Sequence, residues 1–422
     1  MTKGVDTNYP RKPLAGLRVL EMGQLLAGPF ASVLLAWFGA EVIKIEQPGE
    51  GDPLRAWRSL YKGTSLWWYI LGRNKKSVTV NLRTPDGQSI VRRLVEKVDV
   101  VLENFKPGTM EKWGLGYEEL KKINPRIIMA RVSGWGQDGP YSNKPGFASV
   151  AEAVGGLRFV TGYPDSPPVR PNLSLGDTLA GLHAALGILV AVYHRDVVGS
   201  GVGQVVDVAL YESVFNVMEG IVPDFDKVGL VRQREGNRLS GIVPTGTWRC
   251  RDDKYVVIGG NGDSIFRRFM LAMGRPDLAS DPMLEHNNGR VKHAEMIDNA
   301  ISVWTGQHSL QEVIASLEKA EVPVGPIYSV ADMVEDPHFI ARGLFETHTL
   351  PDGTTVKLPS LAPKLAETPG RTEWIGPELG AHNAEILGTL LGISEEEMLH
   401  LVQTGVVGSK KTTAAISDTA KQ

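Results

Sequence analysis

Residues 17–46, LRVLEMGQLLAGPFASVLLAWFGAEVIKIE, decide the fold that we expect for this chain. The runs at 17–22 and 40–46 have the apolar, β-branched character of buried strands, and the apolar segment between them is typical of a helix. Pro29 suits the first turn of that helix and Gly39 suits its end. A compact β–α–β unit predicts a parallel sheet with right-handed crossovers.

The loop inside this unit argues against the ligand that such units most often bind. The segment GQLLAGP at 23–29 lacks the G-x-G-x-x-G spacing that brings a pyrophosphate against a helix N-terminus. A nucleotide-binding oxidoreductase, or a non-catalytic binding module on the same scaffold, therefore stays as an alternative rather than as the main hypothesis.

Strand and helix patterns continue to alternate after the first unit. Further strands are expected at 77–82, 99–105 and 126–134, with helices at 84–98 and 117–124 between them. This alternation predicts an α/β fold.

Polar residues follow several of the expected strands. Ligands of open α/β sheets bind outside the carboxyl ends of the strands, so the loops after these strands should share one rim. The candidates for binding are Asn81, Asn104, Phe105 and Lys106, and the alternative for each is a surface turn residue.

Composition excludes several classes of protein. Hydrophobic residues make up 42% of the 422 residues, and 45 basic against 48 acidic residues give a net charge of −3, so we expect an ordinary soluble globular protein without a nucleic-acid partner. The single Cys250 allows no internal disulfide, the polar N-terminus lacks a signal-peptide core, and the apolar run 182–193 looks too short to span a bilayer. We therefore expect a cytoplasmic protein with no membrane partner. The nine histidines lack metal-ligand spacing, which predicts no metal site.

One acidic residue stands just ahead of a long run of small and apolar residues. In PNLSLGDTLAGLHAALGILVAVYHRDV, residues 171–197, glycines and alanines recur every three or four positions, which suits a helix packed closely on a neighbour. Asp177 has two interpretations. It is either the N-cap of this helix or a partly desolvated carboxylate at the positive helix end, available as a nucleophile or base.

The composition of the sequence changes near residue 222. A charged, irregular stretch leads to a smaller α/β piece, which contains the loop Gly259-Gly260-Asn261-Gly262-Asp263. The glycines permit a mobile lid or an anion cradle, and the alternative is a plain β–α turn. Short strands resume beyond 344, and the polar segment 408–422 is expected to be disordered.

Several stretches together resemble the class III CoA-transferases, the group of the formyl-CoA and carnitine CoA-transferases. The resemblance rests on residues 13–52, on NLRTPDG, on DVVLENFKPG, on NPRIIMARVSGWGQDGPY and on SLGDTLAG, in this order. It implies an interlocked homodimer in which each subunit is a ring threaded through the other. A Rossmann-like large domain would be built from residues 12–221 and 341–407, with a linker and small domain at 222–340.

The resemblance also implies a chemistry. Asp177 would attack an acyl-CoA thioester to give a mixed anhydride, and the CoA thiolate would return to form an aspartyl-CoA thioester. Gly259 and Gly260 match the loop that covers such intermediates, although Asn261 interrupts the family's glycine run. CoA thioesters are substrates in this scheme, so we expect no separate cofactor.

CoA contacts are implied at three motifs. By position in the motifs they are Leu25, Leu26 and Ala27, then Asn81, Leu82 and Arg83, and finally Asn104, Phe105 and Lys106. Two positions depart from the family. Leu26 stands where formyl-CoA transferases carry a glutamine, which argues against formate and oxalate, and Gln47 replaces a basic residue.

The main rival of the same fold is α-methylacyl-CoA racemase, which needs a histidine and an aspartate in a G-H-D segment. Here the corresponding segment is Gly146-Phe147-Ala148. A two-base racemase is therefore not expected. The stretches PPVRPNLSLGD and NRLSGIVPTG resemble transferases that act on short dicarboxylates, which implies CoA transfer from succinyl-CoA or a similar acyl-CoA to a small mono- or dicarboxylic acid. Arg170 and Arg238 are candidates for binding a distal carboxylate, with surface ion pairs as the alternative.

Overall fold

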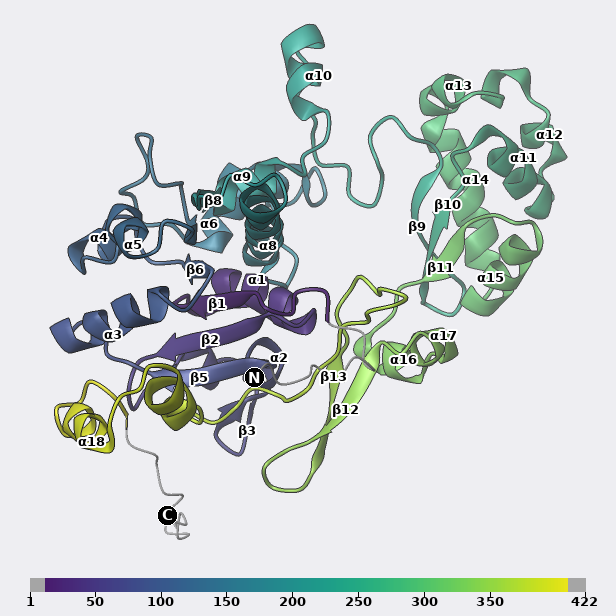
Figure 1. Cartoon of the computed structure of the whole chain (residues 1–422). Helices are drawn as coiled ribbons and strands as arrows, with labels where there is room; N and C mark the ends of the chain where they lie inside the picture. Colours follow the sequence, from purple (N-terminus) through teal and green to yellow (C-terminus); the bar gives the residue numbers. More distant parts are fainter. Residues whose placement is uncertain (1–11, 409–422) are drawn as a thin grey trace, which may run out of the picture. The chain divides into compact units, whose positions relative to one another are not determined.

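The computed structural model describes residues 12–408 and shows two compact units. Of the described residues, 12–156, 171–218 and 341–408 form the larger unit, and residues 157–170 and 219–340 form the smaller one (Figure 1). The segment 157–170 thus belongs with the smaller unit, whereas the sequence placed it in the large domain. The expected disordered tail lies outside the described residues except for Gly408, whose N–H donates to Thr79 Oγ1 at 2.9 Å.

The larger unit contains a six-stranded parallel sheet, which confirms the predicted α/β class. From one edge to the other the strands are β5 (Lys75–Thr79), β2 (Glu41–Glu46), β1 (Arg18–Glu21), β6 (Val100–Glu103), β7 (Ile128–Ser133) and β8 (Val205–Ala209). Chain order runs outward from β1 to one edge and then outward from β6 to the other. This is the doubly wound order of a Rossmann-like fold, with its switch point between β1 and β6.

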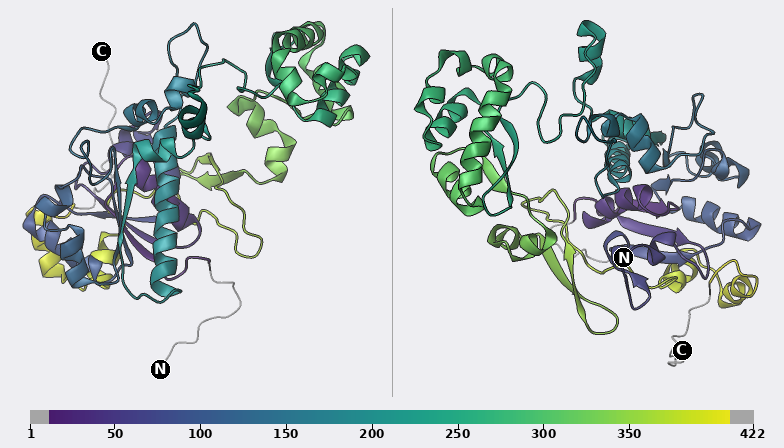
Figure 2. Two further views of the ribbon diagram at one scale, coloured as in Figure 1. Left: turned by 90° about the horizontal axis from the view of Figure 1, so that it is seen from above. Right: turned by 180° about the vertical axis from the view of Figure 1, so that it is seen from behind.

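Helices cover both faces of this sheet (Figure 2). One core joins the sheet to α1 (Ala27–Trp37), α6 (Ala148–Val154), α8 (Leu175–Asp196) and α9 (Leu210–Phe215). The opposite core holds α3 (Pro85–Val95), α4 (Thr109–Lys112) and α5 (Tyr117–Ile123), together with a π-helix (Ala384–Leu390) and α18 (Glu395–Gln403) from the end of the chain. Both ends of the described chain therefore contribute to one unit.

Smaller elements line one side of the larger unit. They are a short helix α2 (Leu66–Leu71), a 3-10 turn (Pro53–Ala56), the ribbon β3 (Leu60–Tyr61) and β4 (Thr64–Ser65), and the hairpin β12 (Phe345–Thr349) and β13 (Thr355–Pro359). A separate apolar cluster around Trp68 and Leu358 holds them together.

Helix α8 packs closely on α1, as its small residues predicted. A Cβ on Gly181 would stand 2.9 Å from the carbonyl oxygen of Ala27. The expectation that the apolar run is too short for a bilayer is wrong on length, because α8 has 22 residues and contains an 18-residue window with a mean hydropathy of 1.7. A core helix passes the same test, and Ala180, Ala184 and Ile188 of α8 lie in the core beside the sheet.

The smaller unit is a three-stranded antiparallel sheet with helices. The strands are β9 (Thr245–Arg249), β10 (Tyr255–Gly259) and β11 (Val324–Pro326), with β10 in the centre. Its core includes Trp248, Cys250 and Phe269. The helices are α7 (Leu157–Val160), α10 (Ile221–Val228), α11 (Asp263–Ala272), α12 (Pro276–Ala279), α13 (Asn287–Lys292), α14 (Ala294–Gln307), α15 (Leu310–Lys319) and α16 (Val330–Glu335), and α17 (Pro337–Ala341) ends where the larger unit resumes.

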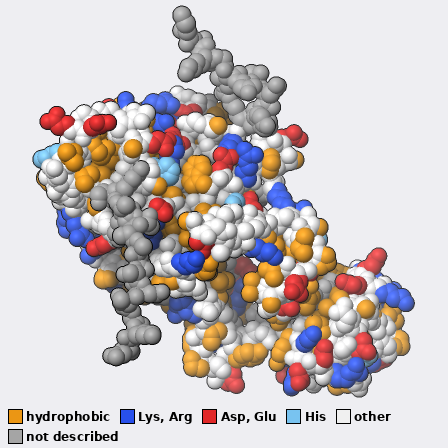
Figure 3. Space-filling model, turned by 90° about the horizontal axis from the view of Figure 1, so that it is seen from below, with side chains coloured by type: hydrophobic (Ala, Val, Ile, Leu, Met, Phe, Trp, Pro, Cys, Tyr) orange, Lys and Arg blue, Asp and Glu red, His pale blue; other side chains and the backbone are white. Residues whose placement is uncertain are grey.

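Side chains of both charges are interspersed on the face drawn in Figure 3. This fits the nearly balanced charge of the sequence.

Candidate active site

A cavity of about 290 Å³ in the larger unit brings several predicted residues together. It lies at the carboxyl ends of β1 and β6, where the strand order reverses. The lining residues are Leu25, Leu26, Ala27, Trp57, Asn104, Phe105, Lys106, Pro107, Val132, Ser133, Gly134, Ser142, Lys144, Pro145, Gly146, Phe147, Ala148, Asp177 and Leu210.

Asp177 reaches this cavity from the first turn of α8. The helix begins at Leu175, and its N-cap is Ser174, so the interpretation of Asp177 as the N-cap is wrong. The partial positive charge of the helix N-terminus favours a carboxylate at this place. The buried Glu152 of α6 accepts the N–H of the preceding residue, Gly176, at 3.3 Å and thereby ties the start of α8 to α6.

The loop after β1 forms a second wall. Leu25 has a positive φ of 62°, which is unusual for a residue with a branched side chain. Asn104, after β6, accepts the N–H of Gln24 at 2.7 Å and donates its amide to the Gln24 carbonyl at 2.8 Å. The Asn104 side chain therefore joins the two loops at the switch point, and its contact with CoA stays a prediction.

The segment 103–106 forms the wall beside this loop. The buried Glu103 carboxylate accepts the Phe105 N–H at 2.7 Å and the Arg131 Nε–H at 2.8 Å. Burial raises the pKa of Glu103 to about 6, although Arg131 opposes the rise. Phe105 packs edge-on against Trp113, with ring centroids 5.2 Å apart, and this orders the segment that carries Lys106.

Asn81, Leu82 and Arg83 do not line the cavity. The Asn81 side chain accepts the N–H of Arg83 at 3.1 Å in the turn before α3, and Leu82 is buried in the core. Their contact with a more distant part of CoA stays a prediction.

Gly259 and Gly260 lie in the smaller unit, at the end of β10. The Gly259 N–H donates to the Pro323 carbonyl at 3.0 Å, and the Gly260 N–H donates to the Pro244 carbonyl at 2.9 Å. A Cβ on Gly260 would stand 2.7 Å from the Phe269 ring, so this position requires glycine for packing. Their role as a lid stays a prediction.

Of the two arginines considered for a distal carboxylate, Arg238 pairs with Asp298 of α14 at 2.6 Å. This pair lies within the smaller unit, as does Arg170. The ion-pair alternative therefore describes Arg238 in this structure.

The sequence missed Trp57 and Lys144, which also line the cavity. Lys144 belongs to the Gly/Pro-rich segment 136–149, which was recognised only as a loop, and its ammonium stands 3.5 Å from the centre of the Tyr141 ring. Lys106 and Lys144 supply two cations to a cavity that contains a carboxylate. Among residues 12–408, no cluster of three or more His, Cys, Asp or Glu side chains is placed to hold a metal ion.

Comparison with known proteins identifies the family of the chain. Residues 14–383 match the model of CoA-transferase family III. The chain is 49% identical to succinyl-CoA–D-citramalate CoA-transferase of Chloroflexus aurantiacus, over 96% of this chain and 100% of that one, and 42% identical to the alpha subunit of succinyl-CoA–L-malate CoA-transferase of the same species, over 94% and 92%. It also superposes on a CaiB/BaiF family crystal structure from Brucella suis with a TM-score of 0.78, at 33% identity, covering 90% of this chain and all of that one.

The larger unit is Rossmann-like and has an aspartate in the cavity at its switch point. Together with the match to the family model, this defines the class as an acyl-CoA enzyme. The chain belongs to CoA-transferase family III, and the enzyme is a CoA-transferase.

Proposed function

We propose that this enzyme moves CoA from succinyl-CoA to a small dicarboxylic acid, with Asp177 as the nucleophile. The observation that carries the proposal is the position of Asp177 in the cavity, together with the loops 25–27 and 104–106. The chain's similarity to citramalate and malate CoA-transferases makes hydroxydicarboxylates the first acceptors to test.

The reaction proceeds in balanced steps. An Asp177 oxygen attacks the thioester carbonyl of succinyl-CoA, the C–S bond breaks, and a mixed anhydride and CoA thiolate result. The thiolate attacks the Asp177 carbonyl, which forms an aspartyl-CoA thioester and releases succinate. The acceptor carboxylate then attacks this thioester, which releases CoA thiolate and forms a second mixed anhydride. The thiolate attacks the acyl carbon of the acceptor, which releases the new acyl-CoA and regenerates the Asp177 carboxylate. No cofactor besides the CoA thioesters takes part.

The cavity supports this chemistry in two ways. Lys106 and Lys144 favour the binding of anionic substrates, and the apolar walls from Leu25, Leu26 and Phe147 limit the water that would hydrolyse an anhydride. Phe147 also leaves the cavity without a histidine at the position where the racemase segment carries one, which favours transfer over racemisation.

We further propose that the enzyme is an interlocked homodimer in the cytoplasm. In the single chain, α8 exposes Leu182, Leu186, Val190 and Tyr193, which recur at spacings of four, four and three. Such an apolar helix face is typical of an interface between subunits. Light scattering should therefore give twice the mass of the chain.

The test of the reaction is a covalent intermediate. The protein is incubated with succinyl-CoA without acceptor, and the peptide containing Asp177 is examined by mass spectrometry for a CoA adduct. We expect the adduct in the wild type and in Asp165→Asn, a change of an exposed carboxylate, and no adduct in Asp177→Ala. Full transferase activity in Asp177→Ala would refute the mechanism.

A further inference from the structure

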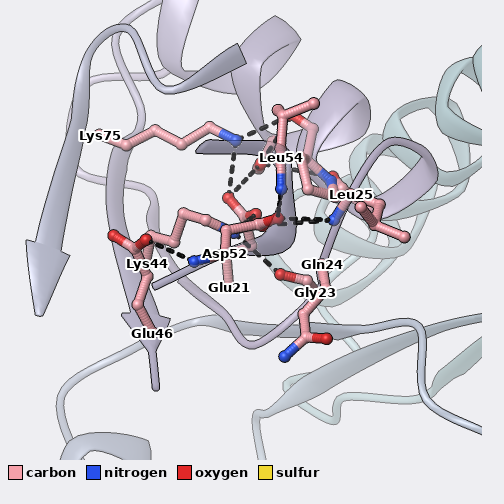
Figure 4. Close-up of polar contacts among 12 residues, drawn as sticks. Glu21, Gly23, Gln24, Leu25, Lys44, Glu46, Asp52, Leu54 and Lys75 are labelled. Atoms are coloured by element: carbon pink, nitrogen blue, oxygen red, sulfur yellow. Dashed lines mark hydrogen bonds and ion pairs between the residues drawn. The ribbon is translucent and has the colours of Figure 1, made fainter. Parts of the chain in front are cut away.

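Four buried charged side chains lie directly beneath the loop after β1 (Figure 4). Lys44 of β2 contacts Glu21 of β1 and Asp52, each at 2.8 Å, and Lys75 of β5 contacts Glu21 at 2.8 Å. All four side chains are at most 1% exposed. The group is neutral as a whole, with two carboxylates and two ammonium groups.

Two members of this network bind the loop itself. Lys44 Nζ donates to the Gly23 carbonyl at 2.9 Å, and Asp52 Oδ1 accepts the Leu25 N–H at 3.0 Å. Asn104 binds the intervening Gln24 through both its N–H and its carbonyl. Three consecutive residues are thus held by three different side chains.

The loop needs such support because its shape is not intrinsically favourable. Leu25 lies in the left-handed region, at φ 62°, which is unfavourable for a residue other than glycine. The Leu25 N–H is held there by a carboxylate rather than by the backbone. Burial alone would raise the pKa of Asp52, but Lys44 and the N–H groups of Leu54 and Leu25 hold it below its ordinary value, so the acceptor stays ionised.

Stability alone does not account for this arrangement. Buried ion networks are often no more stable than well-packed apolar residues of similar volume, because desolvation offsets the attraction. What the network does supply is the position of one cavity wall. Leu25, Leu26 and Ala27 line the same cavity as Asp177.

We propose that Asp52, fixed by Lys44, is a positioning residue that holds the loop Gly23–Leu26 in the shape that the chemical step requires. This inference rests on the proposed function. Asp52 acts through the loop and does not line the cavity. Misplacement of a cavity wall by about 1 Å costs up to about 100-fold in rate, which sets the expected size of the effect.

The experiment compares two substitutions at Asp52 with a matched control. Asp52→Ala removes both the charge that faces Lys44 and the acceptor of the Leu25 N–H, whereas Asp52→Asn keeps an acceptor. The control is Arg195→Met, which removes a guanidinium that is 3% exposed and pairs with Asp99 and Asp196 in the same unit, but touches no residue of the loop. Steady-state kinetics with succinyl-CoA are measured on the folded fraction, together with the rate of adduct formation at Asp177.

We expect kcat to fall about 100-fold in Asp52→Ala and about 10-fold in Asp52→Asn, with KM within about 3-fold of the wild type. Arg195→Met should be less stable but retain its kcat. Equal loss of kcat in Arg195→Met, or wild-type kcat in Asp52→Ala, would overturn the proposal. If Asp52→Ala does not fold, Asp52→Asn decides, and wild-type kcat there overturns it too.

The experiment distinguishes failure of the positioning role from failure of the proposed function. If the wild type forms no adduct at Asp177, the proposed function fails. If the wild type forms the adduct and the Asp52 variants form it equally fast, only the positioning role fails.

Discussion

The loop Gly23–Leu26 in the larger unit and the loop Gly259–Asp263 in the smaller unit are held by different means. The first is bound by Lys44 and Asp52, which are buried, and by the partly buried Asn104, and the three come from separate segments of the chain. The second is held by the partly exposed Thr245, by the exposed His286 and by one fully buried side chain, Arg290 of α13. Its guanidinium donates to the Asn261 carbonyl at 2.6 Å and to Asp263 Oδ1 at 2.7 Å.

The difference lies in how each loop is coupled to its unit. The first loop cannot move without separating buried charges, so its conformation is part of the fold of the larger unit. The second loop ends at Asp263, whose side chain is 50% exposed and is also contacted by His286 at 2.9 Å. A local change at the surface can therefore release the second loop while its unit stays folded. The first loop is therefore a fixed wall of the cavity, and the role of the second loop as a lid stays a prediction.

The largest effect is expected for Lys44→Met in the larger unit. The substitution leaves the buried Glu21 and Asp52 carboxylates without the cation that joins them, which should reduce the free energy of unfolding by about 3–5 kcal/mol. Urea unfolding measures this change. The control, Lys76→Met, removes a half-exposed ion pair with Glu41 and Glu385 and should cost about 1 kcal/mol or less. Equal effects of the two changes would mean that the network is not a rigid support.

Arg290→Met should have the next largest effect, confined to the smaller unit. It removes the donors to the carbonyls of Val243, Leu284 and Asn261, and each buried acceptor left without a partner costs about 1–3 kcal/mol. We expect the opening free energy of the amides at 259–263 to fall by about 2–4 kcal/mol in hydrogen exchange.

The matched control for this change is Arg275→Met. Arg275 forms an exposed ion pair with Asp277 in the same unit and should leave the exchange of the loop unchanged. If Arg290→Met instead lowers the protection of β1 and β2 in the larger unit, the two loops are not independent and the comparison fails.

The fold was predictable to the extent that it depends on local patterns. The β–α–β unit at 17–46 and the later alternation indicated a parallel sheet, because strand and helix periods are read within ten or twenty residues. The order of the strands was not accessible in this way, since β1 lies beside β6, about 80 residues away. Only the strand order places the loops after Met22 and Glu103 next to each other.

The residues of the candidate site could be predicted where they belong to a motif of the family that the sequence resembles. Leu25–Ala27, Asn104–Lys106 and Asp177 were identified by resemblance, and the structure brings them to one cavity. Lys144 had no such signal, because a lysine in a Gly/Pro-rich loop is ordinarily a solvated residue. Lys44 and Lys75 were missed because their burial depends on partners distant in the sequence, Glu21 of β1 for both and Asp52 for Lys44. The N-cap interpretation of Asp177 misplaced the helix start by three residues, because Ser174 and Asp177 are both suitable cap residues.

The pH dependence of the larger unit provides a third test. His382 Nδ1 accepts the Ser77 N–H at 3.1 Å and must be unprotonated to do so. Burial lowers the pKa of His382, and Lys76 adds to this while Glu385 opposes it. A group whose pKa is lowered in the folded state stabilises above its ordinary pKa and loses this contribution as the pH falls. We expect a loss of about 1 kcal/mol on acidification, the worth of one hydrogen bond. His382→Asn keeps an acceptor at this position and should show a smaller loss.

The smallest effect, and the one of opposite sign, is expected at His286 in the smaller unit. Its hydrogen bond with Asp263 raises the pKa of His286, so this pair stabilises the folded state below the ordinary histidine pKa and stops doing so as the pH rises through the raised value. The difference in Tm between the wild type and His286→Gln should therefore shrink on going from pH 5.5 to pH 8 (about the span of the histidine range), and it should vanish in high salt because the pair is exposed. Acidification should therefore lower the stability of the larger unit and slightly strengthen the pair between His286 and Asp263 in the second loop. If the Tm difference between the wild type and His286→Gln persisted at high pH, His286 would act by packing and not by its charge. The contrast between the two loops would then rest on Arg290 alone.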